Sequence, residues 1–513
     1  MPQDISANSK RIAKNTLFLY FRMLLTMAIT LYTSRIVLKQ LGVDDFGIYN
    51  VVGGIVSMFS IISASLTSSI SRFLTFEIGK GSTDYLKVVF STSITIQFFL
   101  ALVIVFLVET VGIWFLNYRM TIAPERLYAA NWVLQCSMVT FVINMLSVPY
   151  NAAIIAHEKM QAFAYVSILE VSLKLGVAFM LYIDFFDTLI MYAILIMLIS
   201  LVIRLVYGVY CDRHFTECHL ERKFDKGLLS RMLSYSGWNF IGSSSAILRD
   251  QGGNILINLF CGTAVNAARG IAMQVHHAVN GFSHNFMLAV NPQIIKSYAS
   301  GERSYMMNLA FKSSRFSYYL LFCLSLPLLI AMPRILSVWL TVVPPYTVDF
   351  ARLILIFGMS ETISLPLQYM NQATGKIMVY QLTVGGLQML NFPLAYLLLK
   401  CGFSPVSVFI LSIVISQVCL SARLLILRRT IGLSIKSFMK NVYLRILSVT
   451  FMGISFPLLY TRTVASTSIA CEVLGCTLSL VMALVSIYLI GCDDEEKKFV
   501  SDRIVSLFFK FKH

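Results

Sequence analysis

The sequence predicts an all-α, multi-pass membrane protein with about 14 transmembrane helices, and three observations support this fold class. The 513 residues are 57% hydrophobic and only 13% charged, against about 25% charged residues in soluble domains. Long apolar stretches recur along the whole chain, and Lys and Arg gather in every second gap between them. This composition excludes a soluble globular protein.

The apolar stretches give the individual spans when about 20 apolar residues are taken as one crossing. We expect spans near 16–38, 46–70, 88–110, 127–149, 161–183, 188–210, 233–258, 264–290, 314–336, 351–371, 377–399, 404–424, 440–460 and 466–490.

The distribution of basic residues tests this count, because cytoplasmic loops are enriched in Lys and Arg. Alternate loops and both termini hold 29 of the 41 basic residues, and the opposite side holds seven. One missed helix would invert every later loop, so the split favours 14 spans with both termini in the cytoplasm. Five basic residues remain inside spans: Arg22, Arg35, Lys174, Arg249 and Arg269.

Two basic cytoplasmic connections, around 211–231 and 423–445, divide the chain. We expect an N-terminal six-helix bundle (1–210), a basic connection (211–232), a C-terminal six-helix bundle (233–430) and a final helix pair (431–490). Leu41-Gly42 and Cys261-Gly262 each close the first helix of a half, which suggests an internal repeat. After the last span, residues 491–513 place Val500, Ile504, Leu507, Phe508 and Phe511 on one face, as in an amphipathic helix on the inner membrane surface.

The net charge of +16 sits in short loops beside the spans, where it meets anionic lipid head groups. We therefore expect membrane lipids as partners and no nucleic acid. The cysteines and histidines lack metal-ligand spacing, and the chain has no phosphate-binding Gly-Lys-Ser/Thr loop. We expect no metal, no cofactor and no catalytic residue, and hence a transporter driven by existing gradients or by consumption of its product.

Ionisable groups inside spans cost several kcal/mol unless they are paired or face water, so each is a candidate site residue. Arg22 shares a face of the first span with Asn15, Thr26 and Thr33, which suggests a polar stripe that faces a cavity. Alternatively, Arg22 extends its charge to the inner interface. In the fifth span, Glu170 and Lys174 are spaced to neutralise each other.

The seventh span carries Asn239, Ser243 and Asp250 on one face, next to Gly252-Gly253. This pattern predicts a locally unwound helix that lines a cavity. Adjacent helical residues point about 100° apart, so we expect Arg249 and Asp250 to have partners other than each other. A purely structural salt bridge between helices is the alternative.

The eighth span is the most polar, with Arg269, His276 and Asn280 on one face. Hydrogen-bonding histidines that line a cavity fit it better than a metal site. Glu361, near the middle of the tenth span, has no basic residue within a helical turn. Asp250 and Glu361 are therefore candidates for ion or proton coupling, unless Glu361 simply bonds a neighbouring helix.

Six stretches of the sequence are distinctive: Arg11-Ile-Ala-Lys-Asn-Thr, Tyr32-Thr-Ser-Arg-Ile-Val-Leu, Leu41-Gly-Val-Asp-Asp-Phe-Gly-Ile-Tyr-Asn-Val-Val-Gly-Gly, Gly237-Trp-Asn, Asn266-Ala-Ala-Arg-Gly-Ile-Ala and Asn291-Pro-Gln-Ile-Ile-Lys. They resemble the bacterial oligosaccharide flippases of the multidrug/oligosaccharidyl-lipid/polysaccharide exporter superfamily, in particular O-antigen and capsule repeat-unit translocases. The resemblance extends to about residue 430, and the last two helices match mainly in number.

The resemblance implies two six-helix bundles around a central cavity, moving a polyprenyl-diphosphate-linked oligosaccharide to the outer leaflet of the bacterial inner membrane by alternating access. Polysaccharide polymerases or glycosyltransferases are then expected partners. Arg22, Arg249 and Arg269 are the expected phosphate contacts, because arginine offers paired donors to phosphate oxygens. His276, Asn280, Asn239 and Ser243 would contact sugars. The acidic Asp250 does not fit an all-cationic cavity, and it weakens the case that Arg249 contacts the diphosphate.

Two alternatives stay open. A cation-coupled antiporter of small organic cations on the same fold would need acidic residues to dominate the cavity, whereas basic residues outnumber them in the first, seventh and eighth spans. A non-transporting scaffold for polysaccharide assembly would make the intramembrane charges dispensable.

Overall fold

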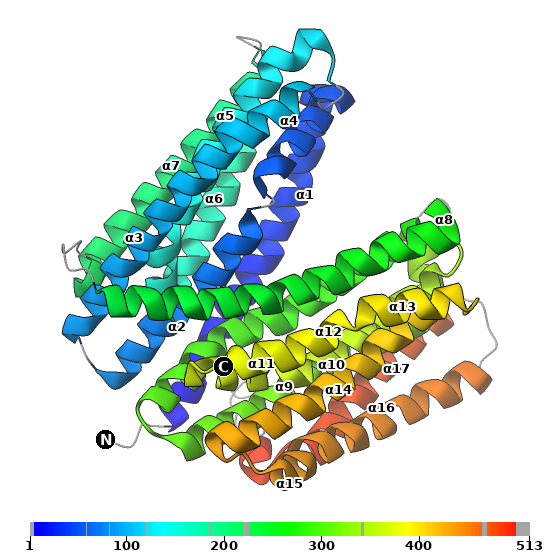
Figure 1. The fold of residues 1–513 in the computed structure, drawn as a ribbon. Helices are drawn as coiled ribbons and strands as arrows, with labels where there is room; N and C mark the ends of the chain where they lie inside the picture. Colours follow the sequence, from blue (N-terminus) through cyan, green and yellow to red (C-terminus); the bar gives the residue numbers. More distant parts are fainter. Residues whose placement is uncertain are drawn as a thin grey trace, which may run out of the picture. The chain divides into compact units, whose positions relative to one another are not determined.

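The computed structural model describes residues 5–498 except 58, 82, 119–121, 184–186, 219–224, 340–342 and 464–468. Over this part of the chain the regular structure is entirely helical (Figure 1). Ten of the described helices are long and apolar enough to cross a membrane. The predicted all-α membrane fold is confirmed. The other four predicted spans (46–70, 233–258, 264–290 and 440–460) are helical where described, apart from a turn at Phe59, but do not meet the same requirement of length and apolarity.

The chain divides into two compact units. Unit 1 comprises Met1–Ser243 and Ile295–Glu302, and unit 2 comprises Ser244–Ile294 and Arg303–His513. Helix α8 (Lys226–Ala299) passes from unit 1 into unit 2 and back. The other helices of unit 1 are α1 (Ile5–Ser57), α2 (Ser60–Lys80), α3 (Thr83–Leu107), α4 (Ile113–Tyr118), α5 (Leu127–Ala156), α6 (Met160–Met180) and α7 (Thr188–His214).

Glycine determines two features of unit 1. Gly42 has φ +74°, a left-handed conformation that breaks α1 where the sequence predicts the end of the first span. Gly79 lets α2 approach the end of α8 closely, because a Cβ there would lie 2.8 Å from Cα of Lys296 and from Cβ of Ala299. Both glycines therefore serve a backbone geometry that a side chain would disturb.

A buried carboxylate joins three segments of unit 1 at its expected cytoplasmic end. Glu158 lies between α5 and α6, is 5% exposed and has φ +59°, which is unusual for a residue with a side chain. Its carboxylate accepts contacts from Arg11 Nε at 2.9 Å and Lys296 Nζ at 2.6 Å, and its carbonyl oxygen accepts a hydrogen bond from Asn15 at 3.2 Å. These interactions compensate both the buried charge and the strained backbone.

In unit 2, α8 folds back on itself between Asp250 and Arg269. A straight helix would separate residues 19 positions apart by about 28 Å, whereas Nη2 of Arg269 lies 2.7 Å from the carbonyl oxygen of Asp250. The fold-back of α8 lies in the stretch from Asp250 to Arg269, where the predicted spans 233–258 and 264–290 meet (Figure 1).

The remaining helices of unit 2 are α9 (Arg303–Trp339), α10 (Thr347–Thr374), α11 (Met378–Tyr380), α12 (Gly386–Met389), α13 (Asn391–Lys400), α14 (Val406–Ile431), α15 (Ile435–Phe438), α16 (Leu444–Thr463) and α17 (Ile469–Ser486). Short π-helical turns, Gln381–Gly385 and Met439–Tyr443, continue α11 and α15. The segment from Met378 to Lys400 thus makes one candidate span out of three short helices.

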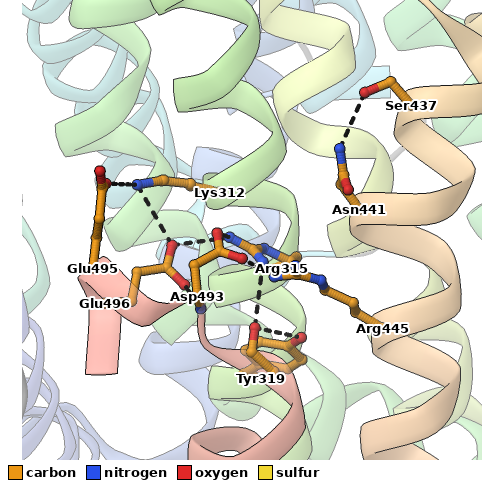
Figure 2. A network of polar contacts seen from close by, with 10 residues as sticks. Lys312, Arg315, Tyr319, Ser437, Asn441, Arg445, Asp493, Glu495 and Glu496 are labelled. Atoms are coloured by element: carbon orange, nitrogen blue, oxygen red, sulfur yellow. Dashed lines mark hydrogen bonds and ion pairs between the residues drawn. The ribbon is translucent and has the colours of Figure 1, made fainter. Parts of the chain in front are cut away.

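Figure 2 shows a network of ion pairs after α17, which we call the C-terminal clamp (Arg315, Arg445, Asp493 and Glu496). Nη2 of Arg315 on α9 lies 2.9 Å from both Oδ2 of Asp493 and Oε1 of Glu496, and Arg445 on α16 also bonds Asp493. Burial opposes ionisation of Asp493, but the hydrogen bonds from Arg315 and Arg445 prevail and lower its pKa to about 2. The clamp fixes the end of α17 to two other helices. The predicted amphipathic residues 500–511 lie outside the described residues.

Three arginines within two residues of the end of a predicted span are buried. Arg72, Arg315 and Arg423 are 7%, 3% and 3% exposed. Each lies within a helix (α2, α9 or α14) that extends beyond the end of the predicted span. Glu170 and Lys174, by contrast, pair as predicted at 2.6 Å.

Candidate functional site

Three arginines and two carboxylates gather in unit 2, and we call them the arginine cluster (Arg249, Arg269, Arg423, Asp250 and Glu361). Arg249 and Asp250 lie on α8 before its fold-back (the outgoing arm), and Arg269 lies after it (the returning arm). Glu361 comes from α10 and Arg423 from α14. The fold-back of α8 and its neighbouring helices therefore bring together charges that are up to 174 residues apart in the sequence.

Arg249 and Asp250 pair directly, with Nε of Arg249 at 2.9 Å from Oδ1 of Asp250. The expectation that neighbours on a helix cannot pair is wrong, because the long arginine side chain bends round to its neighbour. The guanidinium also lies 5.0 Å from the ring centre of Phe357 on α10, in cation–π contact. The Arg249 side chain is 16% exposed and that of Asp250 is 41% exposed. Asp250 thus holds Arg249 while keeping part of its own carboxylate accessible.

Arg269 binds the backbone rather than a carboxylate. Its Nη2 donates to the carbonyl oxygen of Asp250, and a Cβ on Gly253 would lie 3.3 Å from the same nitrogen. A Cβ on Gly252 would lie 2.5 Å from the Phe392 ring of α13. The prediction that the helix is locally unwound here is wrong. Both glycines are helical, and their missing side chains make room for Arg269 and Phe392.

Glu361 begins a chain of polar contacts between α10 and α14. Ser416 donates to Oε1 of Glu361 at 2.7 Å, and its hydroxyl also lies 2.8 Å from that of Ser360. Gln417 donates to Ser360 at 2.6 Å and accepts from Tyr443 at 3.0 Å. Glu361 also interacts electrostatically with Arg249 and Arg423 on other helices. The sequence showed no basic residue near it because these partners are distant along the chain.

Arg423 is the member of the cluster that sequence analysis missed. It is 3% exposed, and its Nε donates to the hydroxyl of Tyr380 at 3.0 Å. Within the described part of the chain, its Nη1 is buried without a hydrogen-bond partner. The signal was the spacing of Ser416, Cys419 and Arg423, which puts all three on one helical face.

His276 and Asn280 lie on the returning arm of α8, as predicted. The His276 ring lies 6.1 Å from the Phe357 ring, and a Cβ on Gly358 would lie 3.1 Å from the His276 ring. His276 therefore packs on the same stretch of α10 that contacts Arg249. Among the described residues, Oδ1 of Asn280 is buried without a hydrogen-bond partner.

The other expected contacts lie in unit 1. Arg22 reaches α6, with Nη1 at 3.5 Å from the hydroxyl of Ser167 and its guanidinium at 4.7 Å from the Phe163 ring centre. Asn239 is buried, and Ser243 is half-buried at the boundary of the unit. The roles of these residues in substrate binding stay predictions.

The arginine cluster carries three fixed positive charges against two carboxylates. Arginine keeps its charge even when buried, because its ordinary pKa exceeds 12. An excess of one positive charge among apolar helices attracts an anion. The cluster therefore suits a negatively charged group better than an organic cation.

Comparison with known proteins shows the family of the chain. A family model described as polysaccharide biosynthesis protein matches residues 12–301, more than half of the chain. The chain belongs to the polysaccharide biosynthesis protein family. A comparison of this sequence with curated proteins finds no match.

Solved structures show which fold this polysaccharide biosynthesis family member shares. It is similar to a MATE protein in the bent conformation (TM-score 0.73, 13% identity), with 84% of this chain and 96% of that one covered. A MATE protein in the straight conformation gives a TM-score of 0.72 at 13% identity, with 84% of this chain and 97% of that one covered. An outward-facing multidrug resistance MATE family transporter of the MOP superfamily gives 0.68 at 13% identity, again covering 84% and 97%. At this identity the likeness establishes the fold, a multi-pass helical membrane protein.

Proposed function

We propose that the protein is a transporter that moves a polyprenyl-diphosphate-linked oligosaccharide from the inner to the outer leaflet of the bacterial cytoplasmic membrane. The product would serve the synthesis of a surface polysaccharide, O-antigen or capsule. The observation that carries the proposal is the net positive arginine cluster in a membrane protein of the polysaccharide biosynthesis family. Both termini would face the cytoplasm.

The chemistry of the carrier explains why arginines are needed. A diphosphate diester carries a charge of about −2 and cannot cross hydrocarbon without compensation. Arg249 offers a partner that is already oriented by Asp250 and Phe357, and Arg269 lies on the same backbone segment. A phosphate that approaches would compete with Asp250 for the donors of Arg249. Binding would thus transfer Arg249 from Asp250 to the substrate.

This exchange also suggests how substrate binding and a coupling ion could be linked. Once Arg249 turns to a phosphate, the carboxylate of Asp250 is free to bind a proton or a cation. Glu361 interacts electrostatically with the same arginine and so responds to the same event. Asp250 and Glu361 are therefore the proposed coupling residues, working in alternating access.

Deletion of the gene tests the function at the cellular level. We expect a lipid-linked oligosaccharide to accumulate on the cytoplasmic side, and its composition identifies the repeat unit. Arg269→Ala at normal protein level should reproduce the loss of surface polysaccharide. Lys174→Ala is the matched control, because Lys174 is paired with Glu170 outside the cluster. Normal polysaccharide in the Arg269 variant would reject the proposed role and leave a scaffold or a cation antiporter.

A cation antiporter is the second candidate, favoured by the similarity to a multidrug resistance MATE family transporter. It predicts export of a cationic dye from vesicles that contain the purified protein, and tolerance of Arg269→Ala. Dye export together with unchanged lipid-linked intermediates in the deletion strain would establish this candidate instead.

A further inference from the structure

A groove lies within unit 1. It has a volume of about 620 Å³ and is formed by α2, α3 and the first arm of α8. Its wall is apolar, with Leu66, Ile96, Phe99, Val103, Leu233 and Phe240 among the lining side chains. This volume is typical of sites that hold a small molecule, about 300–1,000 Å³.

The rim of the groove is open. Phe99 and Phe240 are 62% and 41% exposed, which is favourable for large apolar side chains only when hydrocarbon surrounds them. On the α8 side of the groove, Gly237 is exposed and lacks a side chain, and a Cβ there would meet no atom within 4 Å. The missing side chain leaves space that the neighbouring helices do not fill.

Cations stand at one end of the groove. Lys226, Leu233, Gly237 and Phe240 follow one another at spacings that keep them on one face of α8. Lys226, the first residue of α8, is exposed on this face, and Arg231, five residues further on, is also exposed but starts about 140° round the helix from Lys226. By the charge distribution of the loops, this end of the groove is its cytoplasmic end.

The acidic residue that precedes Lys226 in the sequence is already engaged. Asp225 caps α8, accepting from the backbone nitrogens of Gly227 at 2.7 Å and Leu228 at 3.2 Å. Arg231 donates through Nη2 to the hydroxyl of Tyr85 at 2.7 Å, which orients its guanidinium on the α3 side of the groove. An arginine has five N–H donors, so it can bind an anion as well. The groove thus pairs an apolar wall with a cationic end.

We propose that this groove binds an anionic phospholipid of the inner leaflet, with one acyl chain along Gly237 and the phosphate at Lys226 and Arg231. The wall matches the chain, and the two cations match a head group with a net negative charge. Because α8 continues into unit 2, a lipid held at its first arm would influence the helix that carries Arg249 and Arg269. The inference does not depend on the transported substrate.

Native mass spectrometry of the delipidated protein with dioleoyl phosphatidylglycerol tests this site. We expect one tightly bound lipid on the wild-type chain and weaker binding of dioleoyl phosphatidylcholine, whose head group has no net charge. Gly237→Leu should abolish the tight binding by filling the groove. Lys226→Gln and Arg231→Gln should each weaken it about fivefold, and together about 30-fold.

Gly176→Leu is the matched control, because a Cβ at Gly176 on α6 also meets no atom within 4 Å. It should bind phosphatidylglycerol as the wild type does. An intact melting temperature for Gly237→Leu shows that lost binding reflects the filled groove rather than unfolding. Unchanged binding by Gly237→Leu, equal binding of phosphatidylcholine, or selective binding of a polyprenyl phosphate in place of phosphatidylglycerol would each overturn the proposal.

Discussion

Replacement of Arg315 should release the end of α17 and destabilise unit 2. The variant is Arg315→Met, which keeps much of the unbranched side chain but removes the charge. The Arg315 side chain is 4% exposed and lies 2.9 Å from two carboxylates, of which Glu496 is 10% and Asp493 is 35% exposed. Removal of the guanidinium leaves both acids in partly apolar surroundings.

The expected cost follows from this burial. Breaking a fully buried ion pair by removing one partner costs about 3–5 kcal/mol. Asp493 keeps Arg445 and is partly hydrated, so we expect about 2–3 kcal/mol here, which lowers the melting temperature by about 5–10 °C. Lys312→Met is the control, because its contacts with Glu495 and Glu496 are 3.7 Å long. It should cost less than about 1 kcal/mol.

Thermal unfolding of the purified variants in one detergent measures the difference. The folded-state pKa of Asp493 lies near 2, below the ordinary value of about 3.9. The contribution of the clamp is therefore complete above about pH 4 and is lost as the pH falls towards 2. An Arg315→Met variant as stable as Lys312→Met at pH 7 would refute the reasoning, as would a difference that grows on acidification.

Two further substitutions test other parts of the structure. Glu361→Gln should slow transport by a factor of about 5–150, which corresponds to typical coupling free energies between sites. The melting temperature should stay unchanged. Full transport activity across pH would remove Glu361 from the coupling site. Gly79→Ala should destabilise unit 1 by about 1–3 kcal/mol, because its Cβ would overlap the backbone at Lys296. Gly176→Ala, with open space around it, should not; equal melting temperatures for the two variants would contradict the close approach of α2 and α8.

Much of the fold could be predicted because the bilayer constrains a sequence strongly. Span length and loop charge depend on local composition, so the helical class and the break at Gly42 followed from short stretches. The same local rule failed at Arg72 and Arg423. A hydropathy boundary marks where apolar residues stop, but a helix continues as long as other helices supply contacts.

The candidate site was predictable only in part, for a similar reason. Arg249, Asp250 and Arg269 were found because charges inside spans are conspicuous. Their pairing was not found, because it depends on side-chain reach and on the fold-back of α8. The spacing of Ser416, Cys419 and Arg423 puts Arg423 on a polar face of α14, but it does not show that this face meets Glu361 on α10.

The two basic partners of Glu158 become available at different times during synthesis of the chain. Its carboxylate is buried between Arg11, which is made 147 residues earlier, and Lys296, which is made 138 residues later. At about 5–20 residues per second, Lys296 emerges roughly 7–30 s after Glu158. During that interval the nascent first bundle carries a strained turn with only part of its final compensation. The N-terminal helices therefore mature only after the returning arm of α8 has been synthesised, and a chain that stops before Lys296 should be a substrate for membrane proteases.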